Sequence, residues 1–187
     1  MPTRMHAPMH ELATAVAETA RAVRPDQLGD RTPCEKFTVA ELLGHLGAAL
    51  ADSERAARRQ PRPKDGQPSV SYAPEDVAAV ALGATAAWAD PAAYEGTTVF
   101  GPGEMPAEFA AAITLEELAL HGWDLARATG RTFPVGAGTQ QAVLGIVEQI
   151  AEQARSNGGY GPPRVAPADA SPFDHALATS GRDPHWA

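Results

Sequence analysis

The sequence predicts an all-α fold, a four-helix bundle with crossover connections, long loops and a short C-terminal helical tail. Hydrophobic residues make up 44% of the chain but aromatic residues only 6%, so the core must consist largely of Ala, Leu and Val. Such a composition favours helices that pack closely on one another. Runs of β-branched and aromatic residues, which favour strands, are scarce.

The first two predicted helices lie in the N-terminal third of the chain. Leu12, Val16 and Val23 recur on one side of a helix over residues 6–24. Thr38 is a good N-cap and Glu41 follows three residues later, a capping-box pattern that starts a second helix over residues 39–60. The Pro- and Gly-rich residues 61–74 are predicted to form a long surface connection.

The remaining elements are bounded by proline and glycine. A third helix is predicted over residues 75–90, an extended segment over residues 97–100, and a fourth helix over residues 106–129, which ends before Gly130. A fifth helix follows over residues 139–157. The tail, residues 158–187, contains one short helix at residues 173–179. We expect it to pack back on the bundle, so that residues 1–187 form a single domain.

Charge and composition exclude several classes of partner. The chain has 15 basic and 23 acidic residues, a net charge of −8, so nucleic acid is not an expected partner. No apolar run approaches membrane-spanning length, and nothing near the N-terminus resembles a signal peptide. Cys34 is the only cysteine. We therefore expect a cytoplasmic protein that acts on a small molecule, with a homodimer left open.

Three residues form the candidate site. Glu117 and His121 are four residues apart, a spacing that stacks a carboxylate and an imidazole on one helix face. His45 lies in the middle of the second predicted helix. Brought together, the three could hold a divalent metal ion with open coordination positions. The alternative is a Glu–His pair on a solvated helix face and a core histidine whose ring nitrogens are satisfied elsewhere.

Two motifs and a short stretch of the tail carry a resemblance to a known family. Residues 32–46 fit T-P-C-x-x-[WF]-x-V followed by L-x-x-H-L, residues 121–130 read HGWDLARATG, and the tail contains TSGRDPHW. The sequence resembles the actinobacterial branch of the DinB/YfiT-like metal-binding helix bundles, more narrowly the N-terminal domain of mycothiol-dependent maleylpyruvate isomerase. The resemblance implies a DinB-like bundle in which His45, Glu117 and His121 bind Zn²⁺, with Ni²⁺ or Fe²⁺ as alternatives, and mycothiol as a co-substrate.

The resemblance implies a metal-dependent enzyme that activates a small thiol for S-transfer or for isomerisation of an electrophilic small molecule. Two alternatives stay open: a metal ion that activates water or a substrate oxygen without a thiol, and a metal- or small-molecule-binding protein without turnover. The bundle is followed by a short tail and not by a second folded domain, so maleylpyruvate isomerisation itself is not expected. Phe37 stands where the family often has tryptophan.

Asp124 lies three residues after His121, on the same helix face. It could hydrogen-bond to a metal-ligating histidine and so orient its ring, bind substrate, or pair with an arginine such as Arg127 or Arg182. The ion pair is the favoured interpretation.

Four further residues are considered as members of the site. Cys34 is predicted to be a small buried hydrophobe rather than a nucleophile, and Glu41 a helix cap rather than a fourth ligand. His175 and His185 lie in the tail, and the sequence leaves open whether either approaches the metal.

Overall fold

The structure is a computed structural model that describes residues 3–61 and 71–187, and within these ranges it is predominantly helical. This confirms the predicted all-α class. The predicted connection over residues 61–74 falls mostly on residues 62–70, which lie outside the described residues. None of the described helices is long and apolar enough to span a membrane. The helices are α1 (Thr3–Arg21), α2 (Val39–Ala57), α3 (Pro74–Ala87), α4 (Ala107–Ala128), α5 (Ala137–Ser156) and α6 (Pro172–Thr179).

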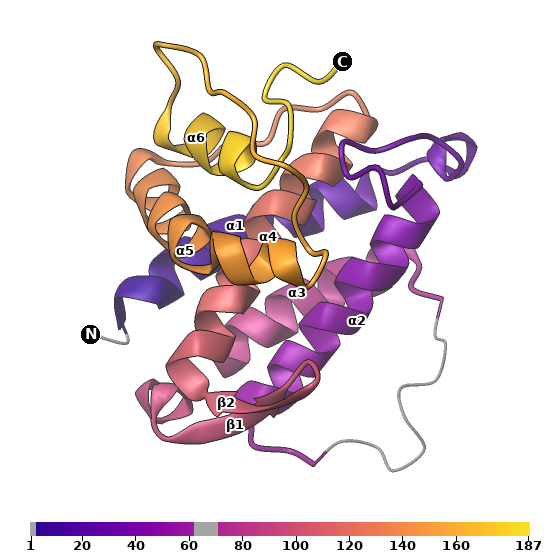
Figure 1. Cartoon of the computed structure of the whole chain (residues 1–187). Coiled ribbons are helices and arrows are strands. Elements are labelled where there is room, and N and C mark those ends of the chain that lie inside the picture. The colour runs from indigo at the N-terminus through magenta and orange to yellow at the C-terminus, as the bar shows by residue number, and fades with distance from the viewer. Residues whose placement is uncertain (1–2, 62–70) are drawn as a thin grey trace.

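Helices α1 to α4 form the bundle. Both α1 and α2 pack against α3 and against α4, so that the four helices share one core. Helix α5 lies against α4 and α1, and α6 packs on α5 on the side away from α3 (Figure 1). The pairing that matters for the site is α2 with α4, because these helices carry the three candidate ligands.

Local sequence signals set the limits of α2 and α4. The hydroxyl of Thr38 accepts a hydrogen bond from the Glu41 backbone N–H, and the Glu41 carboxylate accepts from the Thr38 backbone. This is the predicted capping box, and it fixes the start of α2. Helix α4 ends where Gly130 adopts a positive φ of 70°, a conformation that glycine reaches without strain.

A β-hairpin closes one end of the bundle (Figure 1). Strand β1 (Thr97–Phe100) confirms the predicted extended segment, and it pairs antiparallel with β2 (Gly103–Pro106), which the sequence did not predict. The Asp52 carboxylate accepts a hydrogen bond of 2.9 Å from the Gly101 backbone N–H, and Thr98 Oγ1 donates to the Ala56 carbonyl at 2.6 Å. Both bonds anchor the hairpin to the C-terminal half of α2.

The C-terminal segment returns to α4 after α6. Arg127 donates from its guanidinium to the Trp186 carbonyl, and Trp186 packs against the core. Arg155 of α5 donates to the Thr179 carbonyl at 2.8 Å and holds the end of α6. These contacts place residues 180–187 over the C-terminal half of α4.

A buried polar network links three helices of the bundle. Trp88 Nε1 donates to Ser53 Oγ at 2.9 Å, and Ser53 Oγ lies 2.6 Å from Thr114 Oγ1, which donates to the Ala110 carbonyl. Ser53 is on α2, eight residues after His45, and Thr114 is on α4, three residues before Glu117. The network therefore fixes the position of α2 relative to α4, the two helices that carry the candidate ligands.

Replacing Ser53 by alanine should lower the free energy of unfolding by about 1–3 kcal/mol, because the buried indole N–H of Trp88 loses its acceptor. Urea denaturation followed by far-UV circular dichroism measures this loss. The matched control is Ser156→Ala, which removes an exposed hydroxyl at the end of α5 and should change little. Equal effects of the two substitutions would contradict a stabilising role for the network.

Candidate metal centre

The three predicted ligands lie together where α2 crosses α4. His45 Nε2 is 3.2 Å from Glu117 Oε2, and His121 Nε2 is 3.7 Å from the same oxygen. The two imidazole rings meet edge to face, with centroids 4.7 Å apart. One nitrogen or oxygen from each residue lies within 4.8 Å of the others, so their lone pairs can converge on one point.

Asp124 fixes the orientation of the His121 ring. Its Oδ2 is 2.9 Å from His121 Nδ1, and because an ionised carboxylate only accepts, Nδ1 donates to it and Nε2 is left facing Glu117. Arg182 donates to both oxygens of Asp124, at 2.8 and 2.7 Å. Burial opposes ionisation of Asp124, but the charge of Arg182 holds the pKa of that carboxyl below its usual value. Of the two predicted arginine partners, Arg182 is the correct one.

His45 and Glu117 are joined by a hydrogen bond that shifts the pKa of both groups. This bond raises the pKa of His45 more than burial lowers it, so that the pKa lies above its ordinary value. Burial opposes ionisation of Glu117, but the same bond and the nearby His121 hold the pKa of that carboxyl below its ordinary value. The Phe37 ring stacks on His45 with centroids 4.9 Å apart and limits the rotation of the imidazole.

A second acid, Glu116, is buried beside the cluster. It accepts a hydrogen bond of 2.9 Å from the Tyr160 hydroxyl, and both side chains line the same cavity as the cluster. Burial, with a smaller effect of the neighbouring Glu117, raises the pKa of Glu116 to about 8. The carboxyl is therefore mainly protonated at neutral pH and can donate as well as accept a hydrogen bond.

The cluster opens onto a cavity of about 380 Å³ between α4, α5 and the tail, here called the tail-side cavity. The side chains of His45, Glu117 and His121 form part of its wall, and Phe37, Phe109 and Ile150 contribute apolar surface. Hydrogen-bonding groups surround the remainder, from Lys36, Glu116, Gln153, Asn157, Tyr160 and Arg182. A cavity of this size accommodates a small organic molecule.

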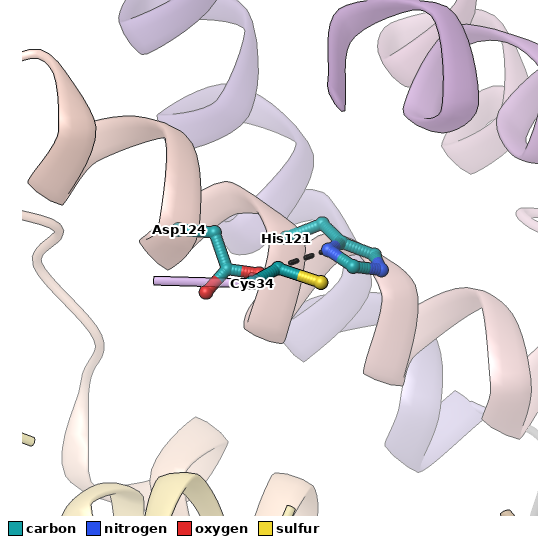
Figure 2. A group of neighbouring side chains, drawn as sticks. All are labelled: Cys34, His121 and Asp124. Carbon is teal, nitrogen blue, oxygen red and sulfur yellow. Dashed lines mark hydrogen bonds and ion pairs between the residues drawn. The ribbon is translucent and has the colours of Figure 1, made fainter. Parts of the chain in front are cut away.

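Cys34 lies closer to the cluster than the sequence indicated. Its thiol, one ring nitrogen of His121 and an Asp124 oxygen lie within 4.8 Å of one another and form a second group that could hold a metal ion (Figure 2). In that group His121 Nδ1 is already bonded to Asp124, and Asp124 is already bonded twice to Arg182. The group of His45, Glu117 and His121 is the better candidate because its lone pairs are not committed to an arginine.

Burial raises the pKa of the Cys34 thiol, and Arg182 offsets only part of this effect. Less thiolate is therefore present at a given pH than in a free cysteine. Because only the thiolate is nucleophilic, Cys34 should react more slowly than a free cysteine. We expect iodoacetamide to alkylate Cys34 of the metal-free protein more slowly than N-acetylcysteine amide at pH 8, with a rate that still rises above pH 9. Mass spectrometry of timed samples measures both rates. A rate that is already constant below pH 8 would show a reactive thiol instead.

The other sequence candidates lie away from the cluster or act structurally. Glu41 is the predicted helix cap, and its carboxylate is engaged by Thr38. His175 and His185 are exposed in the tail and do not line the tail-side cavity. Tyr160 and Glu116 were not predicted. Glu116 adjoins Glu117 in the sequence, but it lies on a different side of α4 and gave no spacing signal.

The donor set fits a divalent metal ion. Two imidazole nitrogens and one carboxylate oxygen are typical ligands of catalytic zinc, which keeps a fourth position for water or substrate. Asp124 behind His121 is the carboxylate–histidine arrangement that fixes the tautomer of a ligating ring. Ionised Glu117 would supply negative charge to such a cation.

Fold and site together define an α-helical bundle with two histidines and a glutamate clustered on the wall of a cavity. The sequence profile of the mycothiol maleylpyruvate isomerase N-terminal domain matches residues 9–126. The chain belongs to this family, as the two motifs of the sequence indicated. The match ends two residues after Asp124, so it contains all three candidate ligands but not Tyr160 or Arg182.

Individual proteins similar to this chain are also known. Uncharacterized proteins from two strains of Mycobacterium tuberculosis are each 31% identical over 118 residues, which cover 63% of this chain. The chain spans 63% of the length of these curated relatives. Two crystal structures of the mycothiol-dependent maleylpyruvate isomerase, one of them a histidine-to-alanine mutant, match with TM-scores of 0.60 and 0.61. The match covers 91% of this chain and 78% of theirs, at 14% and 12% identity, and establishes a common fold.

Proposed function

We propose that this chain is an enzyme that holds one divalent metal ion, Zn²⁺ in the first instance, through His45, Glu117 and His121. The enzyme would use a mycothiol-like thiol as the nucleophile toward an electrophilic small molecule, for S-transfer or for isomerisation. The observation that carries the proposal is the convergence of three donor atoms on the wall of a cavity of about 380 Å³. Membership of a family named for mycothiol indicates the thiol.

A bound divalent cation would supply the positive charge that deprotonates an adjacent thiol near neutral pH. The chain itself would provide orientation. Asp124 holds the proton of His121 on Nδ1 and directs Nε2 toward Glu117. Arg182 balances the charge of Asp124, so that this buried carboxylate stays ionised and accepts the hydrogen bond from His121 Nδ1.

The remaining cavity groups would bind and orient the two reactants. Phe37 stacks on one face of the His45 ring. The buried Glu116 carboxyl would offer a hydrogen-bonding group to a substrate in this cavity. Tyr160 holds that carboxyl in place through its hydroxyl.

Calorimetry with mycothiol tests the proposal. Zinc-loaded protein should bind mycothiol with release of about one proton per thiol, visible as a dependence of the binding enthalpy on the buffer. Metal-free protein and S-methylated mycothiol provide the two controls, and both should bind much more weakly. Equal affinity of the thiol and its S-methyl form, or binding that does not depend on zinc, would exclude thiol activation at this site.

A further inference from the structure

The Cys34 thiol is held beside the metal cluster by a hydrogen-bonded turn. Buried Thr32 places its Oγ1 2.8 Å from the carbonyl oxygens of both Cys34 and Phe37. The Phe37 backbone N–H donates to the Cys34 carbonyl at 3.0 Å. The Phe37 ring packs on both histidines of the cluster, with centroids 4.9 Å from that of His45 and 6.0 Å from that of His121. The position of the Cys34 sulfur relative to the cluster is therefore set by the fold.

This sulfur is within ligand distance of His121. The sulfur, a ring nitrogen of His121 and an oxygen of Asp124 lie within 4.8 Å of one another (Figure 2). Asp124 is the least available of the three, because both of its oxygens accept from Arg182. The thiol and the imidazole remain as a pair of donors. Metal bonds of roughly 2.3 Å to sulfur and 2.1 Å to nitrogen let one ion join the two donors in a nearly straight line within this limit.

Ions can reach the Cys34 sulfur from two sides. Cys34 is half-buried and lines both the tail-side cavity and a neighbouring cavity of about 330 Å³, which the turn at residues 33–36 forms with residues 159–164 and 180–182. Because Cys34 is the only cysteine in the chain, any bond between a metal ion and a thiolate of this protein involves this residue.

The two groups that share His121 suit different ions. Thiolate is a soft donor that selects Cu⁺ and similar ions, whereas the carboxylate oxygen of Glu117 is a harder donor. Zinc in proteins takes four ligands, and the group of His45, Glu117 and His121 offers three of them. Monovalent copper and silver ions are satisfied by two or three donors. A thiolate and an imidazole are therefore sufficient for a monovalent soft ion and insufficient for zinc.

Charge also favours a monovalent ion between Cys34 and His121. The thiol releases its proton to water when the ion binds, and a bond forms between sulfur and the ion. The neutral imidazole contributes a lone pair, and the ion keeps its oxidation state. One positive and one negative charge then cancel, so no net charge is added beside the buried pair of Asp124 and Arg182.

We propose that Cys34 and His121 form a second metal site that takes a soft monovalent ion such as Cu⁺, and that this ion competes with zinc for His121. A neutral imidazole has one ring lone pair, so His121 serves one ion at a time. The soft-ion site itself needs neither the zinc site nor a thiol co-substrate. Only its competition with zinc rests on the proposed function.

Silver ion, a stable soft monovalent probe, tests the site in chloride-free buffer. Competition with N-acetylcysteine amide measures affinity, and the charge-transfer absorption between thiolate and silver reports the sulfur ligand. Wild-type protein should bind one Ag⁺ per chain more tightly than the free thiol does. Cys34→Ser should lose the absorption and the tight binding but keep its affinity for zinc. Tight Ag⁺ binding by Cys34→Ser, or an Ag⁺ affinity of wild-type protein no higher than that of the free thiol, would overturn the proposal.

Two histidine variants separate the soft-ion site from a lone thiol. His121→Ala should weaken Ag⁺ binding at least about tenfold, because loss of a ligand costs no less than loss of its outer partner. His45→Ala is the matched control: it should lose zinc as His121→Ala does, but bind Ag⁺ as the wild-type protein does. Far-UV circular dichroism checks folding, and His121→Gln replaces His121→Ala if the latter is unfolded. Equal Ag⁺ affinities of the two histidine variants would contradict the assignment.

Zinc displacement tests the sharing of His121. One equivalent of Ag⁺ should release zinc from zinc-loaded wild-type protein, detected with a chromogenic chelator, and should release none from Cys34→Ser. Simultaneous binding of both ions by wild-type protein would overturn the competition. If no version of the protein binds zinc, the proposed function fails, whereas the Ag⁺ affinities of His121→Ala and His45→Ala still decide whether the soft-ion site exists.

Discussion

Replacing His121 by alanine should abolish stoichiometric zinc binding. The substitution removes one of the three converging donors, and Asp124 loses the ring that it orients. Loss of an outer partner of a metal ligand already costs about 10- to 100-fold in affinity, so loss of the ligand itself should cost more than about 100-fold. Elemental analysis after dialysis against a weak chelator, together with competition titration, measures this loss.

The matched control is His175→Ala, which removes an exposed histidine of α6 that does not line the cavity. This variant should keep about one zinc ion per chain, as the wild-type protein should. If His121→Ala kept its zinc while unfolding normally, the metal would be held elsewhere. If both variants lost it, the loss would reflect general damage to the bundle and not the removal of a ligand.

Replacing Arg182 by alanine should lower the free energy of unfolding by about 3–5 kcal/mol, because it leaves the buried Asp124 charge without its partner. Arg182 exposes only 7% of its surface and Asp124 none, so water does not solvate either charge in the folded protein. Guanidinium denaturation of the metal-free protein measures the difference. The Asp124 carboxylate would also lose the group that holds it against His121.

An exposed ion pair provides the control for this prediction. Arg24 and Asp26 are paired at 3.2 Å with 61% and 71% of their side chains exposed, and water and salt screen such pairs so that they contribute little to stability. Arg24→Ala should therefore change stability little. A loss below about 1 kcal/mol for Arg182→Ala would mean that the pair with Asp124 contributes no more than a surface contact.

The sequence predicted the bundle because its helices are bounded by local signals. Thr38 with Glu41 starts α2, and Gly130 with its positive φ ends α4, and both signals act within a few residues. Strand β2 was missed because Gly103 and Pro106 are poor strand formers. The hairpin forms through tertiary bonds instead, such as that from Gly101 to Asp52, 49 residues earlier.

The same distinction explains which site residues could be predicted. Glu117 and His121 are related by helical spacing, and the sequence motifs paired them with His45. Tyr160 reaches Glu116 only because the chain after α5 folds back over α4. The sequence named Arg182 as one of two partners for Asp124, but only the packing of the tail decides between Arg182 and Arg127, which instead bonds the Trp186 carbonyl.

The central claim is that His45, Glu117 and His121 hold a metal ion that can accept a thiol. X-ray absorption at the zinc edge tests this claim most directly. We predict two imidazole nitrogens at about 2.0–2.1 Å and no sulfur in zinc-loaded protein, and one sulfur at about 2.3 Å after addition of mycothiol. Sulfur before any thiol is added would place the zinc at Cys34, His121 and Asp124. That result, or a spectrum that mycothiol leaves unchanged, would contradict the claim.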